Sequence, residues 1–200
     1  MLPFVRKFCC IFLFYFFVQP AFAQNVAYVN EKAIGAKEFM WIYKKNHPNV
    51  ANASYQDLAD YLKLYTHFKL KVAEAKALGL DTDTAYKKEI NGYEKALKAQ
   101  KKISPKSITF NYIMNEYREG VLMFAISEQK IWSKTQNNDG QLLDFYQKNK
   151  SIYNNRDFSE VRGQVSSDYE LSLEDQWIKS LTSKYTIKIN EEELRKLARP

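Results

Sequence analysis

The run SYQDLADYLKLYTHFKLKVAEAKALG, residues 54–79, decides how much of this 200-residue chain is expected to fold. Apolar side chains recur in it at alternating steps of three and four, which is typical of a helix with one buried stripe. These side chains are Leu58, Tyr61, Tyr65, Phe68, Val72 and Ala75. Ser54 is a favourable N-cap, Asp57 completes a weak form of the capping box, and Gly79 suits the position after a helix end. The run therefore predicts a helix over residues 55–78.

A second apolar stripe follows this helix after a short turn at residues 80–83. Its side chains are Tyr86, Ile90, Tyr93 and Leu97, again at helical steps. Two helices with matched stripes and a short connection are typical of an antiparallel helical hairpin. We therefore expect the helix over residues 55–78 to pair with the helix that carries the second stripe.

The rest of the chain also favours helices. Residues 98–107 are rich in lysine and contain Pro105, which predicts a solvated loop. Apolar spacing then predicts a long helix over residues 108–135 and a shorter one around residues 142–146. Another long helix is expected over residues 158–184, where the apolar steps are nearly all four. Because each such step advances about 40° around the helix, the two ends of this helix should face different neighbours.

Two short segments at opposite ends of the chain read as strands. Residues 26–30 and 186–190 both alternate apolar and polar side chains. Asn190 then precedes a last helix with three glutamates in its first turn, which suits the helix dipole. Pairing of the two strands would join the chain ends. The sequence therefore predicts a mainly α fold, a single domain over residues 24–200 closed by a small antiparallel β pair.

The first 23 residues have the layout of a cleaved export signal. Arg6 and Lys7 precede an uncharged apolar run over residues 8–18, and Ala21 and Ala23 supply small residues before a cleavage point at Gln24. The apolar run is shorter than the roughly 20 residues that a membrane-spanning helix needs. We expect residues 1–23 to be removed, with no stable membrane insertion afterwards.

Removal of this segment changes the composition that matters for function. The remaining 177 residues carry a net charge of +5 and contain no cysteine, so disulfide and thiol chemistry are not expected. His47 and His67 are their only histidines, and their spacing predicts no metal site. No glycine-rich phosphate loop or nucleophile motif is present, and we predict no cofactor. Lysines alternate with glutamates along the expected helices, which indicates solvated faces and not a nucleic-acid surface.

Tyrosine is the distinguishing residue, with 13 copies after the first 23 positions. Its rigid apolar body and polar tip suit a surface that binds varied partners. Their helical spacing is equally typical of a helix core, so the sequence leaves both interpretations open for the tyrosines of the stripes. The candidate contact residues are Met40, Trp41, Tyr43, Tyr61, Tyr65, Phe68 and Trp132.

Several segments resemble the exported SurA/PrsA/PpiD-type foldases, a peptidyl-prolyl isomerase family of the PpiC type. The resemblance begins in VAYVNEKAIGAKEF (26–39) and is most specific in YLKLYTHFKLKVAEAKALGLDT (61–82). It continues in YEKAL (93–97), EYREGVLMF (116–124), WSK (132–134), EVRGQV (160–165) and DYELSLEDQWI (168–178). The resemblance implies a SurA-N-like helical chaperone domain that acts in the periplasm.

The family carries a catalytic parvulin domain between its N-terminal and C-terminal halves, and no such motif occurs here. Only the junction loop 101–107 lies between residues 24–100 and 108–200. The resemblance therefore implies a non-catalytic holdase for unfolded or outer-membrane-bound polypeptides. The alternatives are a prolyl isomerase with a cryptic site and a dedicated adaptor subunit of a periplasmic assembly. The oligomeric state is left open between a monomer and a homodimer.

Overall fold

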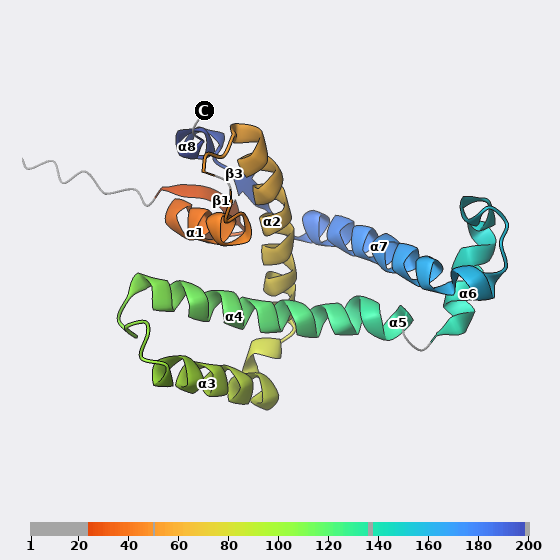
Figure 1. Cartoon of the computed structure of the whole chain (residues 1–200), viewed down its shortest axis with the longest axis horizontal. Helices are drawn as coiled ribbons and strands as arrows, with labels where there is room; N and C mark the ends of the chain where they lie inside the picture. Colours follow the sequence, from red (N-terminus) through yellow and green to blue (C-terminus); the bar gives the residue numbers. More distant parts are fainter. Residues whose placement is uncertain (1–23, 50, 136–137, 199–200) are drawn as a thin grey trace, which may run out of the picture.

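The computed structural model describes residues 24–49, 51–135 and 138–198, so the expected export signal lies outside the described residues. Figure 1 shows a head, a helical layer beneath it and an arm that projects to one side. The long helices are α1 (Ala36–Asn46), α2 (Tyr55–Ala77), α3 (Thr84–Ala99), α4 (Ile108–Ser127), α6 (Asp139–Lys148) and α7 (Phe158–Lys184). Short helical segments are η1 (Leu80–Thr82), η2 (Glu128–Trp132), α5 (Ser133–Thr135), η3 (Lys150–Tyr153) and α8 (Glu191–Leu197). The expectation of a mainly helical fold is confirmed.

The head contains a three-stranded antiparallel sheet in the order β2–β1–β3. Its strands are β1 (Asn25–Val29), β2 (Lys32–Gly35) and β3 (Ile187–Ile189). The predicted pairing of the two chain ends is confirmed, since Ala27 faces Ile189 and Val29 faces Ile187. Strand β2 was not predicted because its four residues carry little alternation of their own. It forms because Asn30, at φ 52°, turns the chain back along the free edge of β1.

Helix α2 begins and ends as its sequence predicts. The Ser54 hydroxyl accepts a hydrogen bond from the backbone N–H of Asp57, and the Asp57 carboxylate accepts one from the backbone N–H of Ser54. Together these two bonds form a complete capping box. At the other end Gly79 adopts φ 77°, a left-handed conformation that a side chain would strain. The helix therefore stops at Ala77, one residue before the predicted end.

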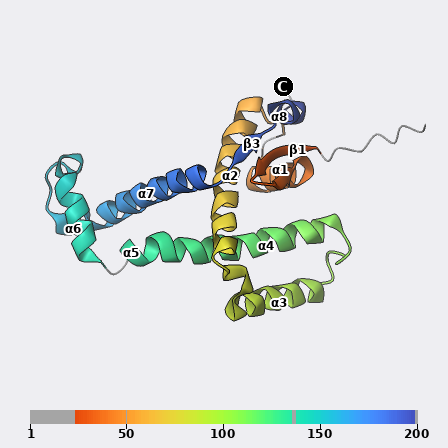
Figure 2. The ribbon, with the colours of Figure 1, turned by 180° about the vertical axis from the view of Figure 1, so that it is seen from behind.

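The helical hairpin involves a different pair of helices from the one predicted. Helix α3 does not run alongside α2; Figures 1 and 2 show it beside α4, while α2 crosses α4 and connects to α3 through η1. One reason is the sharp turn at Gly79 and η1, which redirects the chain. The other is competition, because α4 covers α2 at one apolar cluster and α3 at a second. The α2–α4 cluster contains Val72, Ala75, Leu122 and Ile126. The α3–α4 cluster contains Ile90, Leu97, Phe110 and Met114.

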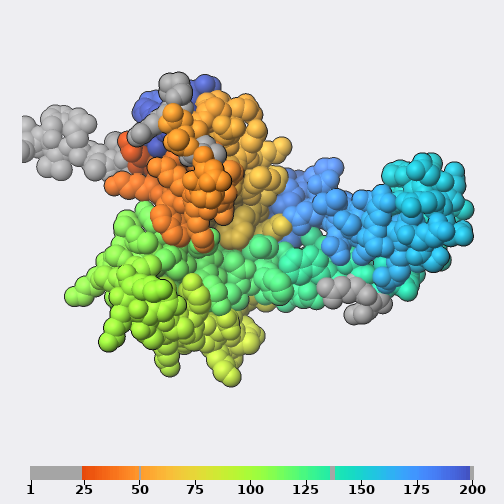
Figure 3. All heavy atoms as spheres, in the orientation of Figure 1, coloured from red at the N-terminus to blue at the C-terminus, as the bar shows by residue number. Residues whose placement is uncertain are grey.

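Helix α7 joins the arm to the head, because its apolar stripe winds around the helix and meets a different neighbour at each end. Near its start, Val161 and Val165 pack against α6 in a small separate core. Near its end, Leu181 is buried in the head core, with Trp177 packed against it. The prediction that the two ends of this helix face different neighbours is confirmed. Figure 3 shows the resulting arm as a narrow projection from the rest of the molecule.

Residues on either side of the 100–107 connection pack against one another. Glu74 of α2 accepts hydrogen bonds of 2.6 Å from both Lys184 and Tyr185 at the end of α7. Strand β1, near one end of the chain, likewise pairs with β3, near the other end. Over residues 24–49, 51–135 and 138–198, no helix combines the length and apolar character that crossing a bilayer requires.

Candidate functional site

Six of the seven candidate contact residues lie on α1 and α2. Tyr43 and Tyr65 are buried in the head core at 3% and 7% exposure, and both pack near Phe39. Tyr61 and Phe68 are partly exposed on the side of α2 that faces α4. The structure therefore brings the α2 tyrosines together, with Tyr65 inside the core and Tyr61 at its edge.

The remaining candidates lie further apart. Trp41 packs against Tyr112 of α4, with ring centroids 5.5 Å apart, and Met40 is partly buried against the head core. Trp132 is on η2 at the far end of α4, where it meets Phe124 edge-on at 4.9 Å. Trp132 is thus separated from the cluster on α1 and α2 and belongs to the continuation of α4.

Two hollows meet on the exposed face of α4, and we call them together the α4 groove. The first, about 310 Å³, lies between α4 and the helices α1 and α2; the second, about 510 Å³, lies between α4 and α3. Both are lined by Glu116 and Gly120. The apolar and aromatic lining residues are Ile42, Tyr61, Leu64, Tyr65 and Phe68 in the first, and Tyr93, Ile113, Tyr117, Val121 and Phe124 in the second.

Gly120 is the low point that joins the two hollows. A side chain built there would meet no heavy atom within 4 Å apart from its own helix backbone and chain neighbours, so the surface above it is open. On either side Leu64 and Phe124 are 65% and 60% exposed. Large apolar side chains left this open to water favour contact with an apolar ligand.

Polar groups lie along the rim of the groove. The Lys45 amine forms an ion pair of 2.5 Å with Glu116, which connects α1 to α4. Tyr61 accepts a hydrogen bond of 2.6 Å from the Asn46 amide, and Tyr117 donates one to Glu89. An extended ligand would therefore meet hydrogen-bonding groups beside an apolar floor, the composition usual for binding sites.

Sequence reasoning missed Gly120, Val121 and Phe124 as groove residues. Their signal was available, because Phe124 and Val121 belong to the apolar stripe predicted for residues 108–135. The start of that stripe is buried at Phe110, but further along α4 the side chains that fill the core lie on a neighbouring face of the helix. The buried apolar side chains of α4 are Phe110, Met114, Leu122 and Ile126.

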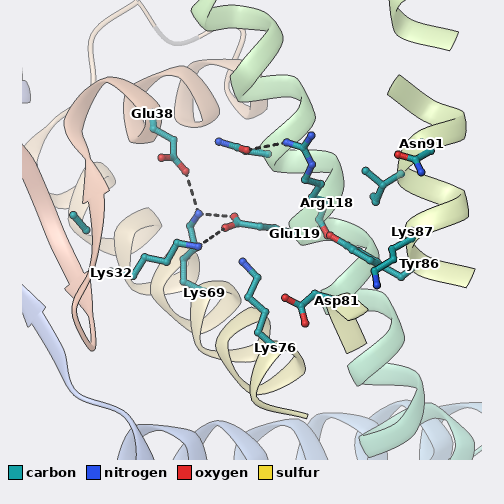
Figure 4. Close-up of a pocket in the computed structure, with 13 residues that line it drawn as sticks. Lys32, Glu38, Lys69, Lys76, Asp81, Tyr86, Lys87, Asn91, Arg118 and Glu119 are labelled. Carbon is teal, nitrogen blue, oxygen red and sulfur yellow. Dashed lines mark hydrogen bonds and ion pairs between the residues drawn. The ribbon is translucent and has the colours of Figure 1, made fainter. Parts of the chain in front are cut away.

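A third hollow of about 460 Å³ lies between β2, η1 and the helices α1 to α4, and we call it the Lys76 pocket. Figure 4 shows its charged lining. Three carboxylates and five cationic side chains line it: Glu38, Asp81 and Glu119, and Lys32, Lys69, Lys76, Lys87 and Arg118. A buried ion cluster forms the wall that separates the pocket from the head core. Lys69 lies 3.0 Å from Glu38 and 2.5 Å from Glu119, and so connects α1, α2 and α4.

The ion cluster also interacts with Tyr65 of the head core. Tyr65 donates a hydrogen bond of 2.9 Å to the same Glu38 carboxylate. Burial, together with the neighbouring carboxylates of Glu38 and Glu119, raises the pKa of Tyr65 far above its ordinary 10.0. Tyr65 is therefore a neutral donor that helps to hold the ion cluster in place.

The two histidines lie in different surroundings. His47 stacks on Tyr43 with ring centroids 4.4 Å apart, and its Nδ1 lies 2.9 Å from the Tyr43 carbonyl oxygen. His67 is on α2, where burial and then the nearby Lys63 and Lys71 lower its pKa. Across the part of the chain that the structure describes, no three His, Cys, Asp or Glu side chains gather in a way that could hold a metal ion.

No protein-family model, curated protein or solved structure matches this chain. The two candidate sites are therefore the α4 groove and the Lys76 pocket. The α4 groove is apolar and open, and the Lys76 pocket is charged and bounded by β2, η1 and the helices α1 to α4. The groove has the composition for binding apolar side chains.

Proposed function

We propose that this protein is a non-catalytic periplasmic holdase that binds unfolded or outer-membrane-bound polypeptides in the α4 groove. The observation that carries the proposal is the open apolar floor on either side of Gly120, with Leu64 and Phe124 largely exposed. The sequence resemblance to SurA-type foldases and the signal-like first 23 residues support the same proposal.

The dimensions of the groove suit short segments of a client. Hollows of about 310 and 510 Å³ fall within the range of roughly 300–1,000 Å³ typical of ligand pockets. Each can take apolar side chains of an extended or locally helical client segment, while the polar groups on the rim form hydrogen bonds with the backbone of that segment. Because the floor is aromatic and not shaped to one ligand, we expect broad specificity and modest affinity.

Binding of this kind needs no nucleotide or cofactor. A holdase that binds the unfolded state lowers the concentration of free, aggregation-prone chains by mass action alone. On this proposal the groove binds clients without a conformational change driven by a nucleotide. On this proposal the missing parvulin domain leaves the client-binding function of the family without its isomerase activity.

The proposal is tested by aggregation of a chemically denatured client that is diluted into buffer with the protein lacking residues 1–23. We expect suppression of light scattering at a few-fold molar excess. Gly120→Leu should lessen the suppression several-fold, because leucine favours helix and would fill the point where the hollows meet. Gly163→Leu on α7 is the matched control, since a side chain there also meets nothing within 4 Å.

Two outcomes would contradict the proposal. Failure of the wild-type protein to suppress aggregation at several-fold excess would reject the holdase function. Equal activity of Gly120→Leu and Gly163→Leu, with unchanged circular dichroism, would reject the groove as the site. A protease-coupled assay on an X-Pro peptide tests the non-catalytic part, and clear turnover would favour the isomerase alternative.

A further inference from the structure

The Lys76 pocket has a surplus of positive charge that the fold itself does not neutralise. Lys69 is held between Glu38 and Glu119, so this one cation uses two of the three carboxylates in the lining. Lys32 approaches Glu119 only at 3.9 Å. Asp81 is the one carboxylate of the described lining outside the ion cluster.

Three cations therefore face the pocket with weak internal partners. Arg118 reaches the Asn115 amide oxygen at 3.3 Å and Glu94 at 3.9 Å, both at the edge of hydrogen-bond or ion-pair range. Among the described residues, neither Lys76 nor Lys87 forms an ion pair with a carboxylate. They come from α2 and α3, while Arg118 comes from α4, so the fold gathers them from separate helices (Figure 4).

Lys76 lies where the fold disfavours its charge. Burial, and then the nearby Lys32 amine, lower the pKa of Lys76 below its ordinary 10.5, and the carboxylates of Glu119 and Asp81 only partly offset this. A cation in such surroundings is disfavoured by the folded protein and gains from any anion that reaches it. This position is unlike an ordinary surface lysine, whose charge water would stabilise.

The shape of the pocket limits the size of its ligand. About 460 Å³ accommodates a small molecule, and the lining has both polar groups and the apolar sides of Tyr86 and Ile90. The pocket shares only Glu119 with the lining of the α4 groove. It is therefore a second site, and its ligand does not depend on what the groove binds.

We propose that the Lys76 pocket binds a small polyanion, bearing phosphate or clustered carboxylate groups, through Lys76, Lys87 and Arg118. Lysine amines act as point charges for such oxygens, and the arginine fork can bind two of them at once. Several cations around one cavity favour ligands with several charges over singly charged ions. The inference does not rest on the holdase proposal.

Isothermal titration calorimetry at low ionic strength tests the proposal on the protein lacking residues 1–23. The probes are pyrophosphate, citrate and inorganic phosphate, with acetate as the singly charged comparison. We expect saturable binding of at least one polyanion, at least tenfold tighter than that of acetate. Pyrophosphate and citrate as separate arms distinguish a phosphate ligand from a polycarboxylate ligand.

Two variants of equal charge make the test specific. Lys76→Gln combined with Lys87→Gln should weaken binding at least tenfold, whereas Lys88→Gln combined with Lys95→Gln, at exposed positions of α3 outside the pocket lining, should not. Thermal unfolding in the absence of anion checks the fold of each variant. Because Lys32 repels the Lys76 amine in the wild type, the pocket variant should melt no lower than the control.

The proposal is overturned if none of the three polyanions binds at millimolar concentration. It is also overturned if the pocket variant and the control variant bind equally, because binding would then reflect the general positive charge of the protein. A melting temperature of the wild type that rises with pyrophosphate or citrate, and of the pocket variant that does not, would support it independently.

Discussion

Replacement of Lys69 by methionine is expected to destabilise the fold by about 3–5 kcal/mol, the usual loss when one partner of a buried ion cluster is removed. Methionine keeps most of the length of the side chain, so the change removes chiefly the charge. Lys69 bonds Glu38 and Glu119, and its amine also lies 4.9 Å from the Tyr65 ring centroid. The substitution therefore acts at a point where α1, α2 and α4 meet.

The magnitude follows from burial and distance. The side chains of Lys69 and Glu119 are only 10% and 9% exposed, so water cannot replace the lost contact. At an effective dielectric constant of about 20, each contact represents roughly 5–7 kcal/mol of Coulomb attraction, much of which offsets desolvation. Lys32 is a poor substitute partner, because it lies 3.9 Å from Glu119 and is 67% exposed.

Urea unfolding at pH 7, followed by far-ultraviolet circular dichroism, measures the effect within a double-mutant cycle. Glu119→Gln alone should cost about 1–3 kcal/mol, since Lys69 keeps its bond to Glu38. The double variant should lose at least about 1 kcal/mol less than the sum of the two single losses, the mark of direct coupling. A loss below about 1 kcal/mol for Lys69→Met, or strict additivity, would refute the reasoning.

Three further predictions concern single positions along α2 and at its ends, one of them compared with a glycine inside α3. Burial opposes ionisation of Glu74, but hydrogen bonds from residues 184–185 outweigh it and hold its pKa below the ordinary 4.5. Its stabilisation is therefore complete above about pH 4.5 and is lost as the pH falls through the lower folded-state pKa. Glu74→Gln should cost about 1–3 kcal/mol at pH 7 and should flatten the acid side of a stability–pH profile, which an unchanged profile would contradict. Gly79→Ala should cost about 1 kcal/mol by urea unfolding because of its left-handed backbone, whereas Gly92→Ala inside α3 should gain about 0.5–1 kcal/mol; effects of the same sign would argue against this. Ser54→Ala should lower stability by about 1 kcal/mol through loss of the N-cap, and a neutral result in the same assay would show that the cap contributes little.

Local signals in the sequence were enough to place most elements of the fold. The capping box at Ser54 and the glycine at position 79 bound α2 because caps and left-handed turns depend on a few neighbouring residues. The drifting stripe over residues 158–184 also predicted that the ends of α7 would have different neighbours, since helix geometry alone turns a step of four. Strands β1 and β3 were visible for the same reason, as alternation along a short segment.

The sequence did not show which helices and strands would pack against one another. Sequence predicted that α2 would pair with the next helix, but the turn after Gly79 and the competing surface of α4 gave α3 another neighbour. Strand β2 shows the same limit, because its conformation depends on the free edge of β1 and not on its own four residues.

The sequence by itself determined where the chain is helical, where the helices stop and that tyrosine and phenylalanine line them. Only the tertiary structure decided that α4 buries the stripe of Phe110 and Leu122 and leaves Val121 and Phe124 beside an open groove. It also decided that Lys76 faces other cations. Both outcomes depend on packing between distant segments, because one helix has several faces and the neighbours that cover them come from elsewhere in the chain.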